Sequence, residues 1–600
     1  MAQPTVHRST PPPPARPGRR ARGTARLTGW RQSLLGSGGL RILAAAAGGF
    51  ALYGSFAPST LWWLAVVGFA LLGLALDGRS WRAGLGLGFV FGLTFYVPLL
   101  SFTNIYVGDL PWYALSVAEA VLTAPAGALI AAASRRLPLW PAWAAAAWLT
   151  GEALRGRWPF GGFPWGGVAF SQPDGPLLPA ASLLGSAGLA FLTALAGFAV
   201  AALLRALVPL PPGRSRPPWR SVAVLGSLGL LVLPVVLGVA GRWTVQHGTD
   251  APTATIAVIQ GNVPRPGLDF NAERRAVLDL HAAQTHRLAD DVRAGRAPAP
   301  TLVVWPENST DIDPYLNADA NAVISDAAAD IGVPILVGAV VQGTQPGDLY
   351  NMGIVWDPVT GPGDTYTKLH PMPFGEYIPF RSFFRLFSDK VDLVRGTFLP
   401  GGHPGNLDID GVPVGDVICF EVVFDDLVRD VVEGGAQVLV VQTNNATFGY
   451  TDETYQQQAM SRVRAVEHGR EVLISSTSGV SAVIRPDGTV ESSIPLFTPG
   501  YLTPTVPLIA ATTPGTVLGA PLEWLLALVT PVALAFLVLR DRRRRRAIPG
   551  PPATEGAPRA STAVAPEPST TTSSVTSTTA NTTASTGGPA TGISREDRTP

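Results

Sequence analysis

Long apolar runs follow one another between residues 41 and 241 of this 600-residue chain, and one more lies near its C-terminus. Each run is close to the roughly 20 residues that an α-helix needs to cross the hydrocarbon of a bilayer. Charged residues make up only 14% of the sequence, against roughly 25% in ordinary soluble domains. We therefore predict a polytopic membrane protein with spans at about 41–57, 60–76, 82–101, 112–133, 139–154, 178–204, 221–241 and 516–539.

Arginines between the spans predict the orientation, because basic residues are concentrated on the cytoplasmic side of a membrane. Alternate connections are rich in arginine, whereas the connection 102–111 contains neither Lys nor Arg. Arg155 and Arg157 are exceptions, which a re-entrant segment within 155–177 would explain. This pattern predicts a plasma-membrane protein with both termini in the cytoplasm and residues 244–515 outside. The arginines on the expected cytoplasmic side are Arg79, Arg82, Arg135, Arg136, Arg205, Arg214, Arg216 and Arg220.

The composition of the two ends of the chain, together with the apolar runs, predicts the boundaries of its parts. The first residues are rich in Pro and Arg and lack periodicity, and the last are rich in Thr, Ser and Pro, which is typical of disordered segments. The expected parts are a disordered basic cytoplasmic tail (1–40), a membrane domain of seven helices (41–243), a catalytic domain (244–515), a C-terminal transmembrane helix (516–540), and a basic anchor with a disordered cytoplasmic tail (541–600).

Residues 244–515 have a different pattern from the apolar runs. Short β-branched segments such as TLVVWPEN, VPVGDVICFE and AQVLVVQTNN alternate with polar helical stretches at 271–296, 318–331 and 453–470. Such alternation predicts an α/β domain with buried strands.

Three expected strand ends in this domain carry reactive groups. Cys419 is the only cysteine, so it cannot form an internal disulfide, and Lys368 is one of two lysines. A thiol that attacks an ester or amide needs a base for its proton and a donor for the oxyanion. Glu307 fits the base, and Lys368 with the backbone amide of Phe420 fits the donors. Each residue also has a structural explanation: a buried apolar thiol, a helix cap for Glu307 and a solvated strand end for Lys368.

The segments around these residues resemble a known family. WPEN around Glu307, YTKLHPMPFGEYIPF around Lys368 and CFE around Cys419 are similar to the Glu-Lys-Cys triad of the nitrilase superfamily. They resemble most closely its membrane-embedded branch, apolipoprotein N-acyltransferase, and the resemblance extends from about residue 40 to 540. It implies a four-layered αββα sandwich outside the cytoplasm, attached to the helical membrane domain.

The resemblance also implies a ping-pong reaction. The thiolate of Cys419 takes an acyl chain from a membrane phospholipid and passes it to the amino group of the diacylglyceryl-cysteine that begins an apolipoprotein. Alternatives are a membrane-tethered nitrilase-like amidase or hydrolase, and a non-catalytic lipid-binding or transport scaffold. We expect no cofactor, no nucleic-acid partner and a monomer. We also expect no metal, because the seven histidines show no ligand spacing.

Further residues follow from the resemblance. Glu376 and Glu421 match acidic residues expected to hold Lys368 and orient the thiol. Asn444 begins a segment, NNATFG, that relatives often write as NDAWFG, so Asn445 stands in place of an acid. Phe420 replaces a tyrosine. Phe270 is the nearest substitute for a tryptophan that the family has on a loop.

Overall fold

The computed structural model describes residues 38–105, 108–207, 218–263, 274–394 and 396–547. The chain forms two units, Met1–Arg540 and Asp541–Pro600. Of the features expected from sequence, Phe270, Arg214, Arg216, residues 1–37 of the N-terminal tail and residues 548–600 of the C-terminal tail lie outside the described residues.

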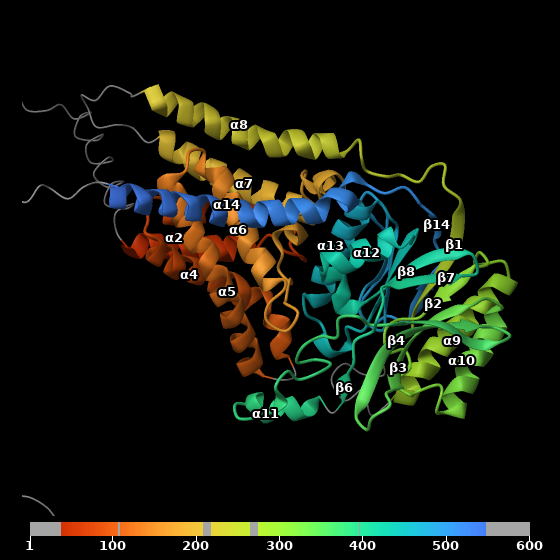
Figure 1. Ribbon diagram of the computed structural model, residues 1–600. Coiled ribbons are helices and arrows are strands. Elements are labelled where there is room, and N and C mark those ends of the chain that lie inside the picture. The colour runs from red at the N-terminus through yellow and green to blue at the C-terminus, as the bar shows by residue number, and fades with distance from the viewer. Residues whose placement is uncertain (1–37, 106–107, 208–217, 264–273, 395, 548–600) are drawn as a thin grey trace, which may run out of the picture. The chain divides into compact units, whose positions relative to one another are not determined.

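A helix lies at each of the eight apolar runs (Figure 1). By length and composition, five of the helices in the described ranges are able to cross a membrane: Trp81–Leu99, Asp109–Arg136, Leu178–Leu207, Val222–Gly241 and Pro514–Arg544. The last helix continues past its expected end at residue 540. The eight are α2 (Gly38–Tyr53), α3 (Trp63–Leu76), α4 (Trp81–Leu99), α5 (Asp109–Arg136), α6 (Trp140–Arg155), α7 (Ala181–Leu207), α8 (Pro218–Gly241) and α14 (Pro514–Ala547).

Small residues allow these helices to pack closely. A Cβ atom at Gly84 of α4 would lie 2.5 Å from the carbonyl oxygen of Gly127 on α5, so the two backbones touch at this point. Close backbone approach at small residues is a common way to join helices in a bilayer, where water does not drive their association. Aromatic rings fill the remaining space; Trp148 of α6 packs edge-on against Phe69 and Phe91.

The central domain contains two β-sheets. The first has the order β13-β1-β2-β3-β4-β5, with β14 also paired to β1 and β6 to β4. The second has the order β12-β11-β10-β9-β8-β7. The strands are β1 (Thr253–Gln260), β2 (Leu302–Val304), β3 (Ile335–Gln342), β4 (Asp348–Asp357), β5 (Gly361–Thr367), β6 (Thr397–Phe398), β7 (Gly405–Ile409), β8 (Val412–Ile418), β9 (Val438–Thr443), β10 (Val472–Ser476), β11 (Ser481–Ile484), β12 (Val490–Ile494), β13 (Gly500–Leu502) and β14 (Thr505–Pro507).

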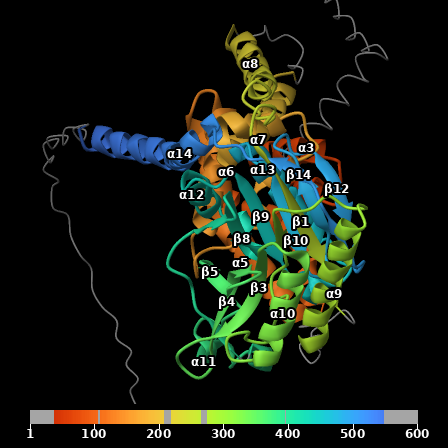
Figure 2. The ribbon, with the colours of Figure 1, turned by 90° about the vertical axis from the view of Figure 1, so that its right-hand side faces the viewer.

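Side chains that alternate between the two faces of each sheet pack against the other sheet on one side and against helices on the other, which gives four layers. On β1, Ile256 and Val258 join the core between the two sheets, whereas Ala257 and Ile259 join the core under α9 and α10. Successive strand residues point to opposite faces, so a strand buried on both sides reads as a continuous apolar run. Helices α9 (Arg274–Arg293) and α10 (Ala318–Ile331) cover the first sheet, and α12 (Asp425–Glu433) and α13 (Glu453–His468) cover the second (Figures 1 and 2). The predicted αββα sandwich is confirmed.

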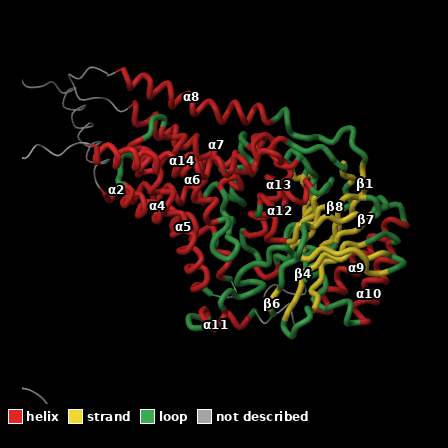
Figure 3. Tube along the Cα trace, viewed as in Figure 1, coloured by secondary structure: helices red, strands yellow, loops and turns green. Residues whose placement is uncertain are grey.

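The long apolar helices and the strands lie in different parts of the molecule (Figure 3), and short helices lie in the connections. They are α11 (Arg381–Phe384) and the 3₁₀ segments η1 (Ser101–Asn104), η2 (Val168–Ser171), η3 (Leu178–Ala180), η5 (Asp389–Leu393), η6 (Cys419–Val423) and η7 (Ala446–Phe448).

The membrane helices and the α/β domain share one hydrophobic core. Leu189 and Leu195 of α7 belong to the same buried cluster as Val463 of α13 and Val422 of η6. Polar contacts reinforce this junction: the backbone N–H of Ser186 donates to Glu467 Oε1 at 2.7 Å, and Ser186 Oγ donates to Asp425 Oδ2 at 2.5 Å. The layer of α12 and α13 is therefore enclosed between the second sheet and the membrane helices.

The two arginines that depart from the charge pattern are both paired. Arg155 is 2% exposed and lies 3.5 Å from Glu119 of α5. Its Nη1 also donates to the carbonyl oxygens of Phe163 and Trp165, at 2.9 and 2.7 Å. Arg157 forms a two-pronged pair with Glu523 of α14, at 2.7 and 2.8 Å. Both charges therefore have partners within the protein, so packing explains their presence in this segment.

Candidate active site

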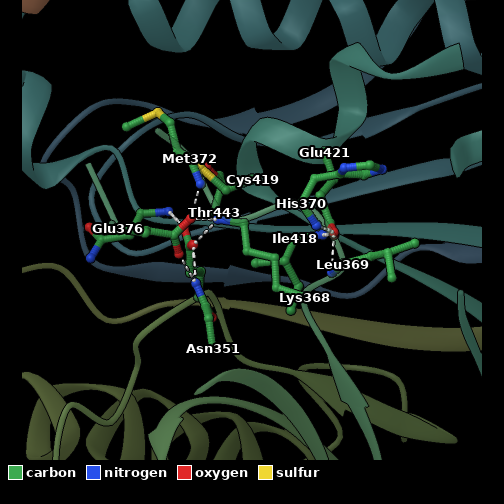
Figure 4. Close-up of polar contacts among 12 residues, drawn as sticks. Asn351, Lys368, Leu369, His370, Met372, Glu376, Ile418, Cys419, Glu421 and Thr443 are labelled. Atoms are coloured by element: carbon green, nitrogen blue, oxygen red, sulfur yellow. Dashed lines mark hydrogen bonds and ion pairs between the residues drawn. The ribbon is translucent and has the colours of Figure 1, made fainter. Parts of the chain in front are cut away.

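Strand ends bring Lys368 and Cys419 together (Figure 4), and Glu307 forms an ion pair with Lys368. Glu307 follows β2 and Lys368 follows β5, both in the first sheet. Cys419 follows β8 and Asn444 follows β9, both in the second sheet. The site therefore lies where the ends of strands from the two facing sheets meet.

Cys419 adopts an unusual backbone conformation. Its φ is +55°, in the left-handed region that side chains other than glycine rarely adopt. The chain turns here from β8 into η6, and the N–H of Ile418 donates to Glu421 Oε2 at 2.8 Å across the turn. Non-glycine residues in this region are concentrated at functional sites, where surrounding contacts hold the strained backbone. Cys419 as a whole residue is partly exposed at this turn.

Lys368 is enclosed by carboxylates. It is 2% exposed, and its Nζ lies 3.0 Å from Glu307 Oε1 and 2.9 Å from Glu376 Oε2. Burial by itself lowers the pKa of this lysine, but Glu307 and Glu376 raise the pKa well above its ordinary value. Lys368 is therefore a fixed ammonium group in the resting site.

Both oxygens of Glu307 have defined partners. Asn351 Nδ2 donates to Oε1 at 2.7 Å, beside Lys368, and the backbone N–H of Asn444 donates to Oε2 at 2.9 Å. Asn351 also donates to Glu376 Oε1 at 2.8 Å, so it joins the two carboxylates that hold the lysine. Sequence reasoning missed Asn351, because its position in the middle of a predicted strand gave no chemical signal. Asn444 contacts Glu307 through its backbone rather than its side chain.

Glu421 holds the chain on both sides of the site. Its Oε1 accepts from the backbone N–H groups of Leu369 and His370, at 2.7 and 3.0 Å. Its carboxylate also accepts from the Tyr366 hydroxyl at 2.9 Å. Burial is the main cause that raises the pKa of Glu421, to about 7. Glu421 thus contacts the backbone next to Lys368 and next to Cys419, which is a positioning arrangement.

The thiol is in an environment that favours its protonated form. Burial is the main cause that raises the pKa of Cys419 above its ordinary value, and the negative charge of Glu307 adds to this effect. The ammonium of Lys368 acts in the opposite direction. A reaction at this sulfur therefore needs a base beside it, and needs the lysine to stabilise the thiolate.

Phe420 faces the loop that follows α6. Its ring stacks on Phe163 and Trp165, with centroid distances of 5.6 and 6.3 Å. Trp165 Nε1 donates to Gln456 Oε1 of α13 at 2.7 Å. The loop after α6 therefore packs against the residue that follows Cys419. Among the described residues, no group of three or more His, Cys, Asp or Glu side chains is arranged to hold a metal ion.

Comparisons with known proteins match both parts of the chain. Residues 48–199 match the family model of the apolipoprotein N-acyltransferase N-terminal domain, and residues 255–513 match that of carbon-nitrogen hydrolase. An apolipoprotein N-acyltransferase of Mycolicibacterium smegmatis is 42% identical over 88% of this chain and 91% of its own length.

Two further relatives extend the comparison. An apolipoprotein N-acyltransferase of Azotobacter vinelandii is 33% identical over 85% of this chain and 96% of its own. Among solved structures, an amidase from Nesterenkonia sp. aligns with a TM-score of 0.32 and 21% identity, over 42% of this chain and 90% of that one.

Proposed function

The chain belongs to the apolipoprotein N-acyltransferase family, and we propose that Glu307, Lys368 and Cys419 are its catalytic triad. It is a membrane acyltransferase of lipoprotein maturation. The observation that carries the assignment of the triad is the buried pair of Lys368 and Glu307, 3.0 Å apart, next to the only cysteine of the chain. The donor is a membrane phospholipid, and the acceptor is a diacylglyceryl apolipoprotein.

In the first half-reaction, Glu307 takes the thiol proton as the sulfur of Cys419 attacks the ester carbonyl of the phospholipid. The oxyanion that forms is stabilised by the ammonium of Lys368 and by the backbone N–H of Phe420. When the intermediate collapses, the carbon–oxygen bond of the ester breaks, and Glu307 returns the proton to the departing lysophospholipid. The acyl chain stays on Cys419 as a thioester.

In the second half-reaction, the amino group of the diacylglyceryl-cysteine attacks the thioester carbonyl. Glu307 accepts a proton from this nitrogen, and the same donors stabilise the second oxyanion. The carbon–sulfur bond then breaks, the sulfur recovers its proton from Glu307, and the product is an amide. Through both steps Glu376 holds Lys368 and Asn351 holds Glu307, and the hydrogen bond from Asn351 to Glu376 joins these two contacts.

The membrane domain favours transfer over hydrolysis. Both proposed substrates are anchored in a bilayer, and a hydrolase of small soluble amides gains nothing from a loop between membrane helices that packs against Phe420. The alternative is that water accepts the acyl group, since an amidase would use the same triad.

We further propose the division into a membrane domain (41–243), a catalytic domain (244–515) and a C-terminal span (516–540). In this arrangement the catalytic domain lies outside the cytoplasm, both termini lie inside, and the protein acts as a monomer. The alternation of arginine-rich connections supports this orientation. A membrane-impermeant thiol reagent applied to intact cells is expected to label a cysteine introduced at the exposed Val359. Labelling only after lysis would contradict the orientation.

A direct test uses purified membranes with a phospholipid carrying a labelled acyl chain and a diacylated lipopeptide. The expected product is a labelled triacylated peptide, with a labelled thioester on Cys419 before the acceptor is added.

Three variants test the triad in the same assay. Cys419→Ser is expected to form no thioester, and Glu307→Gln is expected to form it at least about 100-fold more slowly. Lys368→Arg is expected to form none although it keeps the charge, because the larger guanidinium does not fit between two carboxylates. Free labelled fatty acid as the only product would instead indicate a hydrolase. Normal turnover by Lys368→Arg would contradict the role of the lysine.

A further inference from the structure

Gln457 of α13 lies beside the reactive sulfur. Its side chain is 1% exposed, and its Nε2 is 3.7 Å from Cys419 Sγ, within hydrogen-bonding distance for a sulfur acceptor. An amide N–H stabilises a thiolate more than a thiol, because hydrogen bonds to a charged acceptor are stronger. This contact matters only if the amide presents its nitrogen, and not its oxygen, to the sulfur.

The NH₂ group of Asn445 fixes the orientation of that amide, because it can only donate, whereas the Thr443 hydroxyl can donate or accept. Gln457 Oε1 accepts from Thr443 Oγ1 at 3.0 Å and from Asn445 Nδ2 at 3.1 Å. A flipped amide would place its NH₂ group against the NH₂ group of Asn445, and would leave the oxygen facing the thiolate. Both contacts would then be repulsive, so the nitrogen of Gln457 must face Cys419.

The orientation of Asn445 is fixed in turn. Its Nδ2 also donates to Glu453 Oε2 at 2.7 Å, and its Oδ1 accepts from Ser476 Oγ at 2.7 Å. The hydroxyl oxygen of Ser476 accepts from the backbone N–H of Gly479 at 2.8 Å.

A backbone N–H can only donate, and the Ser476 hydroxyl that accepts from it donates in turn to Asn445 Oδ1. A one-way series of hydrogen bonds therefore runs from Gly479 through Ser476, Asn445 and Gln457 to Cys419. Such chains strengthen the terminal bond, since each member polarises the next.

We propose that Gln457 donates a hydrogen bond to the sulfur of Cys419 and holds it as a thiolate during acyl transfer. This assignment rests on the proposed function of Cys419 as the nucleophile. Gln457 then stabilises the thiolate together with the ammonium of Lys368, whose charge also favours the thiolate. It acts when the thiol loses its proton to Glu307, and again when the thiolate leaves the acyl group.

The test is the pH dependence of alkylation of Cys419 by iodoacetamide in the full-length protein, purified in detergent. The charged groups around the sulfur are Glu307, Lys368 and Glu453, with Glu421 further along η6, and all four are unchanged in the variants. Gln457→Met is expected to raise the apparent pKa of alkylation by about one unit and to slow the reaction at pH 7 about tenfold. Gln457→Glu has the same size as glutamine and is expected to slow it further, because a carboxylate then faces the thiolate.

The matched control is Gln458→Met, the same change at the next residue of α13. It is expected to keep the wild-type profile, since Gln458 is not among the contacts of the sulfur. Asn445→Asp tests the upstream bond and is expected to shift the profile in the same direction as Gln457→Met, because a carboxylate cannot donate to Gln457 Oε1.

A wild-type alkylation profile for Gln457→Met and Gln457→Glu, in protein with an unchanged Tm, would overturn the role of Gln457. If the wild-type protein forms no thioester with labelled phospholipid, the proposed function has failed instead. If Gln457→Met lowers the Tm, Gln457→Glu still tests the electrostatic effect, because glutamate has the same size as glutamine.

Discussion

At the scale of single residues, Asp416 is a buried acid with an unusual environment. It lies on β8 upstream of Cys419, is 0% exposed, and neither of its carboxyl oxygens has a hydrogen-bond partner among the described residues. A Cβ atom at Gly353 of β4 would collide with Asp416 Oδ2, so the glycine makes room for this carboxyl between the sheets. Burial raises the pKa of Asp416 well above its ordinary value, and the charges of Glu421 and Glu307 raise it further.

Replacing Asp416 with asparagine is expected to remove a pH-dependent cost. A carboxyl with a raised pKa in the folded state binds its proton more tightly there, so stability falls as pH rises from about 4, where the unfolded group titrates, toward the folded pKa. The Tm of Asp416→Asn should therefore exceed that of the wild type by more at pH 8 than at pH 5. Thermal unfolding in detergent at both pH values measures this difference. An equal change at the two pH values would show that Asp416 is not protonated in the folded protein.

The sequence predicted those residues of the candidate site that carry a reactive side chain and follow a strand. Glu307, Lys368 and Cys419 stand out because charged or thiol groups follow apolar strands, and the structure brings the three together. It did not predict Asn351 or Gln457. Neutral amides carry no such signal, and their partners depend on how two sheets and a helix face one another.

At the scale of elements, the loop after α6 links the membrane helices to the site. Arg155 holds the loop by its carbonyl oxygens at Phe163 and Trp165, and those two rings stack on Phe420. The sequence located α6 and marked this loop as an exception in its arginine content. It did not show that the arginine is buried, because its partner Glu119 lies on another helix.

The two ion pairs of this region are expected to differ strongly in the stability lost when one partner is replaced. Arg155→Leu leaves Glu119 and two carbonyl oxygens buried without a donor, so it should lower the free energy of unfolding by about 3 kcal/mol or more. Glu523→Gln weakens the more exposed pair of Arg157 and should cost less than about 1 kcal/mol. Thermal unfolding of both variants in detergent compares them. Equal stability losses would contradict the importance of burial.

At the scale of the whole molecule, the shared hydrophobic core makes the α/β domain dependent on the membrane helices. Val422 and Val463 are buried in the same cluster as Leu195 of α7. The apolar runs predicted where the helices lie, since their spacing along the chain is local information. They did not predict this junction, because both of its faces read simply as apolar.

The α/β domain is therefore expected not to form a stable soluble protein by itself. Removing α2–α8 and α14 exposes the outer surfaces of α13 and η6, and large exposed apolar patches favour aggregation. Expression of residues 244–513 alone, followed by size-exclusion chromatography, measures this. A monodisperse, folded domain would contradict the dependence.

The α/β domain has a helix of membrane character at each of its ends, α8 before it and α14 after it. Thr150 Oγ1 and Thr530 Oγ1 further join α6 and α14 by hydrogen bonds of 2.6 and 2.8 Å. Because both ends of the catalytic domain are anchored, the enzyme meets its substrates by diffusion in the plane of the bilayer rather than in solution. Turnover should then follow the mole fraction of donor and acceptor in the bilayer, so diluting both with inert lipid would slow the enzyme even when their bulk concentrations stay constant.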